Sequence, residues 1–273
     1  MKGRPSVVPA GHPPSPRRES KRARSQRLQA IVQVLAQLYP TVTIPLRHQT
    51  PWQLLVATIL SAQCTDATVN KVTPDLFSRY PSAQALAQAP LAPLEALIHS
   101  TGFFHSKARA LLATARQVAA RPDRDLPRTL AELVALPGVG RKTANVLLSA
   151  AEIEKWPGWD ARAGGLGIVV DTHVGRLARR LGLAFSLDPT KVEAELQTVV
   201  PPDEWAIFPL RLIYFGRQTC TSRNPDCPHC PLLSLCPAGP HHGETPWLAT
   251  RGRTAVRAGS SRSSSSPNPA NST

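Results

Sequence analysis

Residues 130–151 read LAELVALPGVGRKTANVLLSAA, and this stretch decides the fold. Two segments in which apolar residues recur at helical spacing flank a short turn, Leu136-Pro137-Gly138-Val139-Gly140. A turn this short brings the flanking helices into a tight hairpin, and its glycines stand where the backbone needs unusual dihedral angles or close approach. The stretch therefore predicts a helix-hairpin-helix.

The turn of this hairpin is suited to bind a phosphate. Gly138 and Gly140 expose backbone N–H groups at the start of the second helix, where unpaired donors and the helix dipole favour an anion. Arg141 and Lys142 open that helix, and a cation there loses about 0.3–1 kcal/mol to the dipole. A bound DNA phosphate would remove this penalty, whereas the alternative is a pair of solvated surface charges. A positive surrounding also favours the neutral amine that Lys142 would need as a nucleophile.

Asp171 stands where the N-cap of a further helix belongs, directly before THVGRLARRLGL. Capping alone would explain an aspartate at this position. The same position can also hold a carboxylate at the edge of a cleft, where it could accept a proton from a lysine or stabilise an oxocarbenium ion. His173 is expected to form a structural hydrogen bond rather than to act as a base.

Four cysteines near the C-terminus, Cys220, Cys227, Cys230 and Cys236, have the spacing C-x6-C-x2-C-x5-C. Crowded cysteines of this kind indicate a metal site in a reducing compartment. A [4Fe–4S] cluster suits four thiolates. Structural zinc usually takes two C-x2-C pairs and only one is present, which makes zinc less favoured than the cluster. Zinc and disulfides remain as alternatives. Cys64 lies in an apolar stretch and is expected to be a buried filler.

The rest of the chain predicts an all-α protein of about ten helices, because apolar residues keep helical spacing nearly throughout and no sustained β alternation occurs. Three helix starts are marked by capping residues. We expect Thr65 to cap a helix over residues 67–80, Ser106 to cap one over 107–120, and Asp188 to cap one over 190–200.

The net charge of +14 is concentrated at the two ends of the chain. Residues 1–24 and 249–273 together hold +10 of it, and both segments lack the apolar periodicity of a packed element. We predict basic, disordered tails that attract a polyanion such as DNA in a salt-sensitive way. No apolar run is long enough for a membrane helix, and the first residues lack the apolar core of a signal peptide, although an organellar transit peptide is an alternative.

Taken together, the motifs resemble one family. LPGVGRKTANVLL, then VDTHVGRLARRL, then GRQTC with its cysteine spacing is similar to endonuclease III, and the match extends upstream through LLVATILSAQCTDATVNK and TGFFHSKA. The resemblance covers roughly residues 25–240, with the motifs in the family's order. Their joint occurrence is far more specific than any one of them.

The resemblance implies a helix-hairpin-helix DNA glycosylase fold with a DNA cleft between two domains. A six-helix barrel would span residues 48–154. A helical [4Fe–4S] domain would combine residues 25–47 with 155–240, leaving residues 1–24 and 241–273 as tails. The expected partner is double-stranded DNA that contains damaged bases or abasic sites. We expect a monomer without membrane association, cytoplasmic and associated with the nucleoid if the source is bacterial.

The resemblance also implies roles for individual residues. Lys142 and Asp171 match the catalytic pair of a glycosylase that also breaks the strand at the abasic site. Gln63 would fill the gap left by the flipped nucleotide, and Phe103 would wedge beside the unpaired base. The cluster would support a loop that contacts DNA, and Arg223 is the cation with which this loop would bind it. The four cysteines match the ligands of the cluster, and Gly138, Gly140 and Arg141 would contact DNA.

Three features depart from the family pattern. The segment over residues 152–169 is longer than usual, the cluster loop over residues 221–226 keeps only Arg223 as a cation, and Phe103 replaces a smaller aliphatic wedge. Two alternative functions remain. An adenine-mismatch glycosylase would need no nucleophilic lysine at position 142, and a non-catalytic helix-hairpin-helix module would not explain Lys142 together with Asp171. Oxidised pyrimidines are the expected lesions.

Overall fold

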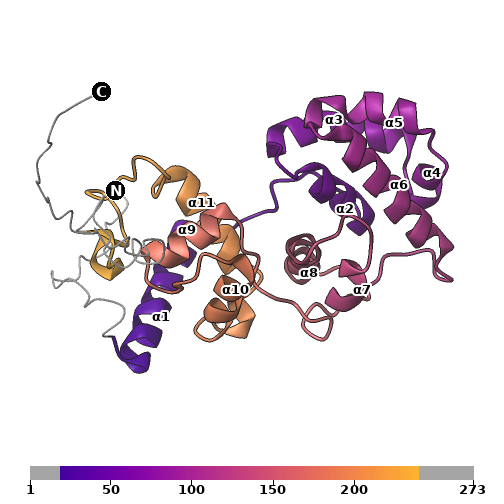
Figure 1. Cartoon of the computed structure of the whole chain (residues 1–273). Helices are drawn as coiled ribbons and strands as arrows, with labels where there is room; N and C mark the ends of the chain where they lie inside the picture. Colours follow the sequence, from indigo (N-terminus) through magenta and orange to yellow (C-terminus); the bar gives the residue numbers. More distant parts are fainter. Residues whose placement is uncertain (1–18, 240–273) are drawn as a thin grey trace, which may run out of the picture.

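The computed structural model describes residues 19–239, and this part of the chain is helical, without a strand (Figure 1). The all-α prediction is confirmed. None of the helices described here is both long and apolar enough to span a membrane. The helices, in chain order, are α1 Lys21–Leu38, α2 Pro51–Leu60, α3 Asp66–Arg79, α4 Ala83–Ala87, α5 Leu91–Ile98, α6 Phe104–Ala120, α7 Leu130–Val134, α8 Arg141–Glu154, α9 Thr172–Arg180, α10 Pro189–Gln197 and α11 Phe208–Gln218, with short 3-10 helices η1 His99–Thr101, η2 Pro202–Glu204 and η3 Leu233–Leu235.

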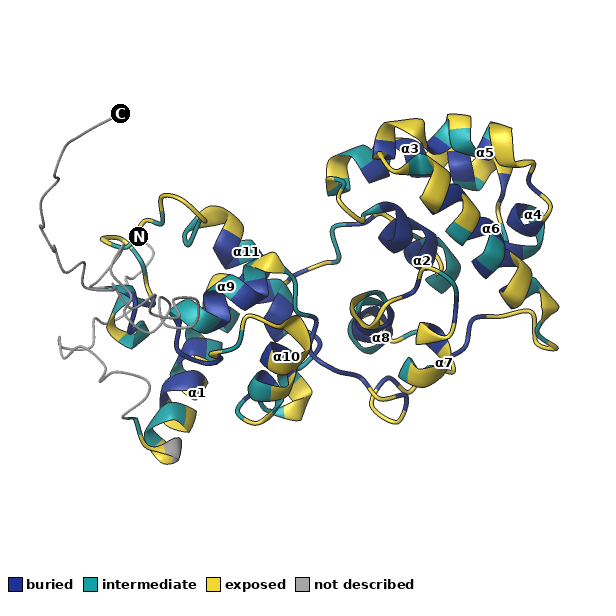
Figure 2. Cartoon of the chain, viewed as in Figure 1, coloured by how far each residue is buried: buried dark blue, intermediate teal, exposed yellow. Residues whose placement is uncertain are grey.

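Helices α2 to α8 enclose one hydrophobic core around α2 (Figures 1 and 2). Every residue from Leu54 to Leu60 is buried, because α3, α6 and α8 all pack on this helix. Thr50 begins α2 by accepting the Gln53 N–H, and Pro51 at the first helical position has no N–H to leave unpaired. The barrel is therefore built around a central apolar helix.

A second core joins α1 to helices from the far end of the chain. Leu28, Ile31 and Leu35 of α1 are fully buried and share this core with Phe208 and Phe215 of α11. Helices α9 and α10 complete the group, which lies beside the barrel in Figure 1. The chain therefore passes between the two cores once after α1 and once after α8.

The long segment after α8 packs on the barrel. The rings of Trp156 and Trp159 meet edge to face with centroids 5.4 Å apart, and both residues pack against the barrel core, as does Leu166. Ile168 is the first residue beyond them in the second core. Residues 155–166 thus pack with the barrel, whereas the sequence places them in the cluster domain. They pack there because the apolar side chains of Trp156, Trp159 and Leu166 are buried or partly buried against the barrel core.

Two of the three predicted helix caps are confirmed. Thr65 caps α3 and Asp188 caps α10. The prediction for Ser106 is wrong, because α6 begins at Phe104 and already includes this residue. Its hydroxyl donates to the Phe103 carbonyl at 2.8 Å instead of accepting from the helix. The helix can start earlier because Phe103 adopts a left-handed conformation with φ 50°.

The first helix begins inside the predicted N-terminal tail. Ser20 caps α1, so residues 19–24 belong to the folded part. Arg27, only 7% exposed, forms two hydrogen bonds with the carboxylate of Glu19, both 2.8 Å long. Arg24 also donates to the Leu183 carbonyl. The predicted tails at residues 1–18 and 241–273 lie outside the described residues.

Removing residues 1–24 should destabilise the protein more than removing residues 1–18. We expect a difference of about 3–5 kcal/mol in the free energy of unfolding, because Arg27 would stay buried without its carboxylate partner. Urea denaturation followed by circular dichroism measures this difference. Equal stability of the two truncated proteins would show that the Glu19 ion pair adds nothing.

Candidate active site and metal centre

The predicted hairpin is formed by α7 and α8. Gly138 has φ +75°, and a Cβ at this position would lie 2.8 Å from the Ala110 Cβ of α6, so the turn requires glycine on both counts. The Val139 N–H donates to the Leu136 carbonyl and closes the turn. Gly140 is the N-cap of α8 and is exposed, with open space where a Cβ would stand. Backbone at the start of α8 is thus accessible to an anion.

The two candidate catalytic residues each stand at a helix start. Lys142 is the second residue of α8 and is exposed. Asp171 is the N-cap of α9, and its Oδ1 accepts the Val174 N–H at 2.8 Å. Its Oδ2 lies 3.2 Å from His173 Nδ1. The capping role predicted for Asp171 is therefore confirmed, and Oδ2, which His173 contacts, is the carboxylate oxygen that the cap does not use.

Arg141 forms an ion pair with Glu193. Its Nε and Nη2 donate to the two carboxylate oxygens of Glu193 on α10, at 2.7 and 3.0 Å. These hydrogen bonds raise the pKa of Arg141 above its usual value. The sequence predicts a DNA contact for Arg141, but the structure commits two of its nitrogens to an ion pair between the two cores. The carboxylate also offsets the positive charge at the start of α8 without any phosphate.

This ion pair belongs to a buried network that the sequence did not indicate. Asn145, one turn along α8, donates to Glu193 at 3.1 Å and accepts the Gly167 N–H at 3.0 Å. A Cβ on Gly167 would lie 2.0 Å from the Glu193 Oε1, so only glycine fits. Glu193 is 4% exposed. The network therefore ties the start of α8, which carries Lys142, to the chain that leads into Asp171.

The candidate filler and wedge both project from strained turns. Gln63 has φ 52° and Phe103 has φ 50°, values that residues other than glycine seldom adopt. Both residues are exposed, and Phe103 is 65% exposed despite its aromatic ring. Strain of this kind persists only where the surrounding structure imposes it, and it is frequent at binding and catalytic sites.

A cavity lies between the start of α3 and the end of α11. Arg217 at the end of α11 forms an ion pair with Asp66 of α3, 2.8 Å apart, across this space. Cys64, expected inside an apolar helix, is partly exposed in the turn after α2 and lines the cavity. The lining residues are Pro45, Arg47, Cys64, Thr65, Asp66, Ala67, Asn70, Lys71 and Arg217. Asp66 pairs with Arg217, so Arg47 and Lys71 give this lining a net positive charge that favours an anionic ligand.

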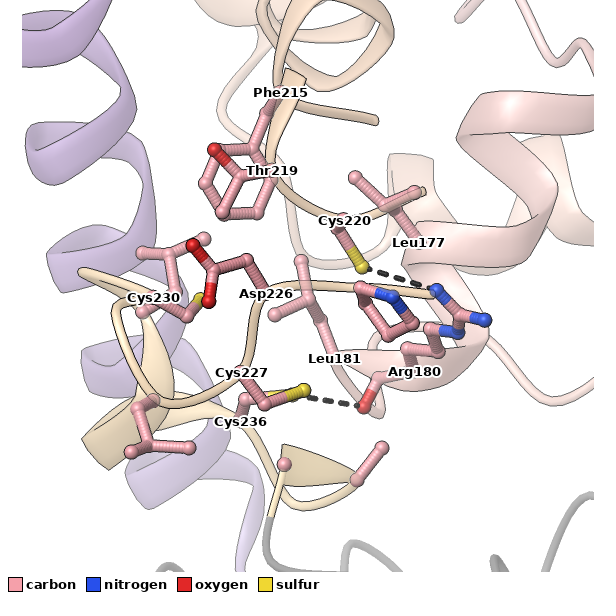
Figure 3. Close-up of a pocket in the computed structure, with 15 residues that line it drawn as sticks. Leu177, Arg180, Leu181, Phe215, Thr219, Cys220, Asp226, Cys227, Cys230 and Cys236 are labelled. Atoms are coloured by element: carbon pink, nitrogen blue, oxygen red, sulfur yellow. Dashed lines mark hydrogen bonds between the residues drawn. The ribbon is translucent and has the colours of Figure 1, made fainter. Parts of the chain in front are cut away.

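The four C-terminal cysteines line one almost wholly apolar pocket (Figure 3). None is in a disulfide. Burial raises the pKa of Cys230 to about 12 and also raises the pKa of Cys227 and Cys236. Within residues 19–239, no three His, Cys, Asp or Glu side chains are close enough to enclose a single metal ion. Four thiols around one apolar pocket nevertheless form a donor set that fits an iron–sulfur cluster, whose binding would release the thiol protons.

Arg180 also lines the cysteine pocket, and no motif in the sequence predicts it there. Its Nη1 donates to Cys220 Sγ at 3.2 Å (Figure 3). Nη1 also donates to the Thr221 carbonyl at 2.7 Å, and Nη2 donates to the Ser222 carbonyl at 2.9 Å. Arg180 thus anchors the predicted DNA-contacting loop, on which Arg223 is exposed. The basic run RLARR in α9 was the only available signal.

Comparisons with known proteins agree with this geometry. Residues 56–202 match the family model described as HhH-GPD superfamily base excision DNA repair protein. The chain is 47% identical to endonuclease III of Synechocystis over 218 residues, 79% of this chain and 94% of the relative. It is 35% identical to endonuclease III of Escherichia coli over 213 residues, 78% of this chain and 95% of the relative.

Solved structures give the same result. A trapped covalent intermediate of endonuclease III with DNA is 39% identical and superposes with a TM-score of 0.72, covering 81% of this chain and 99% of that one. A thermostable thymine-DNA glycosylase, 23% identical with a TM-score of 0.66, covers 77% of this chain and 95% of that one and shares the fold. The hairpin, the two cores and these similarities establish that the chain belongs to the endonuclease III family of the HhH-GPD superfamily.

Proposed function

We propose that this protein removes damaged bases from double-stranded DNA and cleaves the strand at the resulting abasic site, with Lys142 as nucleophile and Asp171 as proton acceptor. The observation that carries the proposal is the exposed Lys142 beside the hairpin turn, on a helix start that one buried network joins to the approach to Asp171. A 39% identical relative has been trapped as a covalent intermediate with DNA, which requires a nucleophile of this kind.

The reaction begins when the damaged nucleotide leaves the base stack. Gln63 fills the vacated space and Phe103 wedges beside the unpaired base. The neutral amine of Lys142 attacks the sugar C1′, the bond from C1′ to the base breaks, and Asp171 accepts the proton released by the lysine. The carboxylate also stabilises positive charge that develops on the sugar.

Strand cleavage follows from the covalent product. The sugar ring opens to a Schiff base between Lys142 and C1′, and the protonated imine draws electrons from the neighbouring carbon. Loss of a proton from C2′ then expels the 3′ phosphate and breaks the strand 3′ to the lesion. Water finally hydrolyses the imine and frees Lys142.

Lys142 distinguishes this function from its two alternatives. An adenine-mismatch glycosylase has no need of a lysine nucleophile at this position. A non-catalytic hairpin module would use the backbone of Gly138 and Gly140 but would leave the paired placement of Lys142 and Asp171 without a purpose. The glycosylase with lyase activity therefore accounts for more of the site.

A panel of duplexes, each with a single lesion, tests the function and its specificity. The protein is incubated with each duplex in borohydride, which reduces the Schiff base, and the products are scored for covalent complex and for nicking. We expect the strongest signal with oxidised pyrimidines and abasic sites. Nicking without any trapped complex would contradict the lysine mechanism. Gel filtration of the same protein tests the predicted monomer.

We also propose that Cys220, Cys227, Cys230 and Cys236 hold a [4Fe–4S] cluster. The bound cluster would stabilise the loop over residues 221–226, which Arg180 already anchors. Each ligand is a cysteine of the apolar pocket, so the cluster would be shielded from water on most sides.

Purified protein should be yellow-brown, with broad absorbance near about 400 nm and roughly four irons per chain, as such a cluster gives. Replacing Cys230 with serine should remove most of the colour and the iron, whereas Cys64→Ser, a cysteine outside this pocket, should keep both. Metal analysis and absorbance spectroscopy measure this. A colourless protein with stoichiometric zinc would contradict the cluster assignment.

A further inference from the structure

Lys107 of α6 is a buried lysine that the proposed mechanism does not use. It is only 5% exposed, and a lysine is seldom buried to this degree unless its amine has a partner. Its Nζ donates to the Leu60 carbonyl at 2.8 Å and to the Thr101 carbonyl at 2.7 Å. Burial lowers the pKa of this amine. One side chain therefore connects two distant segments of the barrel through their backbones.

Both of these carbonyls lie at helix ends. Leu60 is the last residue of α2, and Thr101 is the last residue of η1. The final carbonyls of a helix have no partner within the helix and carry partial negative charge, so an amine donor satisfies them well. Lys107 is thus a shared cap for the two helix ends.

The two capped ends lead directly to the candidate DNA-inserting residues. Gln63 follows Leu60 by three residues, and Phe103 follows Thr101 by two. Each is held in a left-handed conformation that costs about 1–3 kcal/mol and persists only where the surrounding structure imposes it. Gly102, between Thr101 and Phe103, also has positive φ, 68°. Each strained turn therefore follows a carbonyl that is hydrogen-bonded to the amine of Lys107.

We infer that Lys107 is a positioning residue that holds the Gln63 turn and the Phe103 turn at a fixed separation for insertion into one DNA site. The inference rests on the proposed function, because it takes Gln63 as filler and Phe103 as wedge. Both side chains must enter the duplex around a single nucleotide, so their spacing has to be set before binding. Lys107 itself does not touch DNA.

The test compares duplex and single-stranded substrates. Lys107→Met keeps the unbranched side chain up to the position of Cε but leaves both carbonyls without their donor, and Lys107→Gln retains one donor group for a milder change. In single-turnover reactions at saturating protein, we expect Lys107→Met to slow trapping on an abasic duplex by at least about tenfold. Trapping on the same abasic site in a single strand should stay within about twofold, because no nucleotide has to be displaced from a stack.

A fluorescent base gives a direct readout of insertion. With 2-aminopurine opposite an uncleavable abasic analogue, binding of the original protein should unstack the probe and raise its fluorescence. Lys107→Met should lose most of this rise even when the DNA is fully bound. In a Phe103→Ala background, where the wedge is already absent, the further effect of Lys107→Met should be small, since coupled residues are not additive.

Leu111→Ala is the matched control for stability. Leu111 is fully buried on the same helix, one turn beyond Lys107, so its loss weakens the core without touching either carbonyl. The inference would be overturned if Lys107→Met and Leu111→Ala, compared at the same folded fraction, slowed trapping on the abasic duplex equally. It would also be overturned if Lys107→Met slowed trapping equally on the duplex and on the single strand. If Lys107→Met does not fold, the same comparison applies to Lys107→Gln. Failure of the original protein to trap either substrate would contradict the proposed function instead.

Discussion

Lys142→Ala should abolish borohydride trapping, with the rate falling by more than about 10³-fold, as expected when a nucleophile is removed. DNA affinity should stay nearly intact, because the backbone of Gly138 and Gly140 still faces the phosphate and only one side-chain cation is lost. Stability should rise slightly, since a cation at the start of α8 opposes the helix dipole. Loss of activity combined with a gain in stability is the signature of a residue kept for chemistry.

The measurements are covalent trapping on an abasic duplex, a binding titration and urea denaturation of the same variant. Lys191→Ala is the control, because this lysine is also exposed in the first turn of a helix but belongs to α10 and not to the hairpin. It should trap DNA as the original protein does. Undiminished trapping by Lys142→Ala would mean that a different amine attacks the sugar.

The local features of this fold could be predicted from sequence. The hairpin follows from a five-residue turn with a proline and two glycines between apolar helices, and Gly138 does require its lack of a side chain. Thr65 and Asp188 could be predicted as caps, because each accepts from an N–H three residues ahead. Such signals need no knowledge of the rest of the chain.

Features that depend on distant partners could not be predicted. The DNA contact of Arg141 stays a prediction, but its ion pair with Glu193 could not be predicted, because the two residues are 52 positions apart and nothing in the sequence near either one indicates the pair. The start of α6 could not be predicted either, because nothing in the sequence indicates the left-handed conformation of Phe103 that precedes this helix. Tertiary packing therefore decides which charges near the hairpin are free for DNA.

This distinction bears on the basic character of the chain. Arg141 and Arg180 are engaged by protein groups, and Arg217 is paired with Asp66, so net charge overstates the cations available to phosphate. Lys142 differs from Arg141, its exposed neighbour at the hairpin, in forming no ion pair with another residue of the described range 19–239.

Asp171→Asn should separate capping from catalysis. Asparagine caps about as well as aspartate, and its carbonyl oxygen can keep the 2.8 Å contact with the Val174 N–H. Stability should therefore change by less than about 1 kcal/mol. The amide cannot accept the proton of Lys142 or carry negative charge beside the sugar, so single-turnover excision should slow by about 10²–10⁴-fold.

Asp188→Asn supplies a matched control on the next helix. Asp188 accepts the Lys191 N–H at 2.9 Å and is the N-cap of α10 in the same way that Asp171 is the N-cap of α9. Both variants should unfold at similar urea concentrations, whereas only Asp171→Asn should lose excision. If the two variants excise a damaged base at the same rate, capping is the whole role of Asp171, and the proton acceptor for Lys142 must be another group.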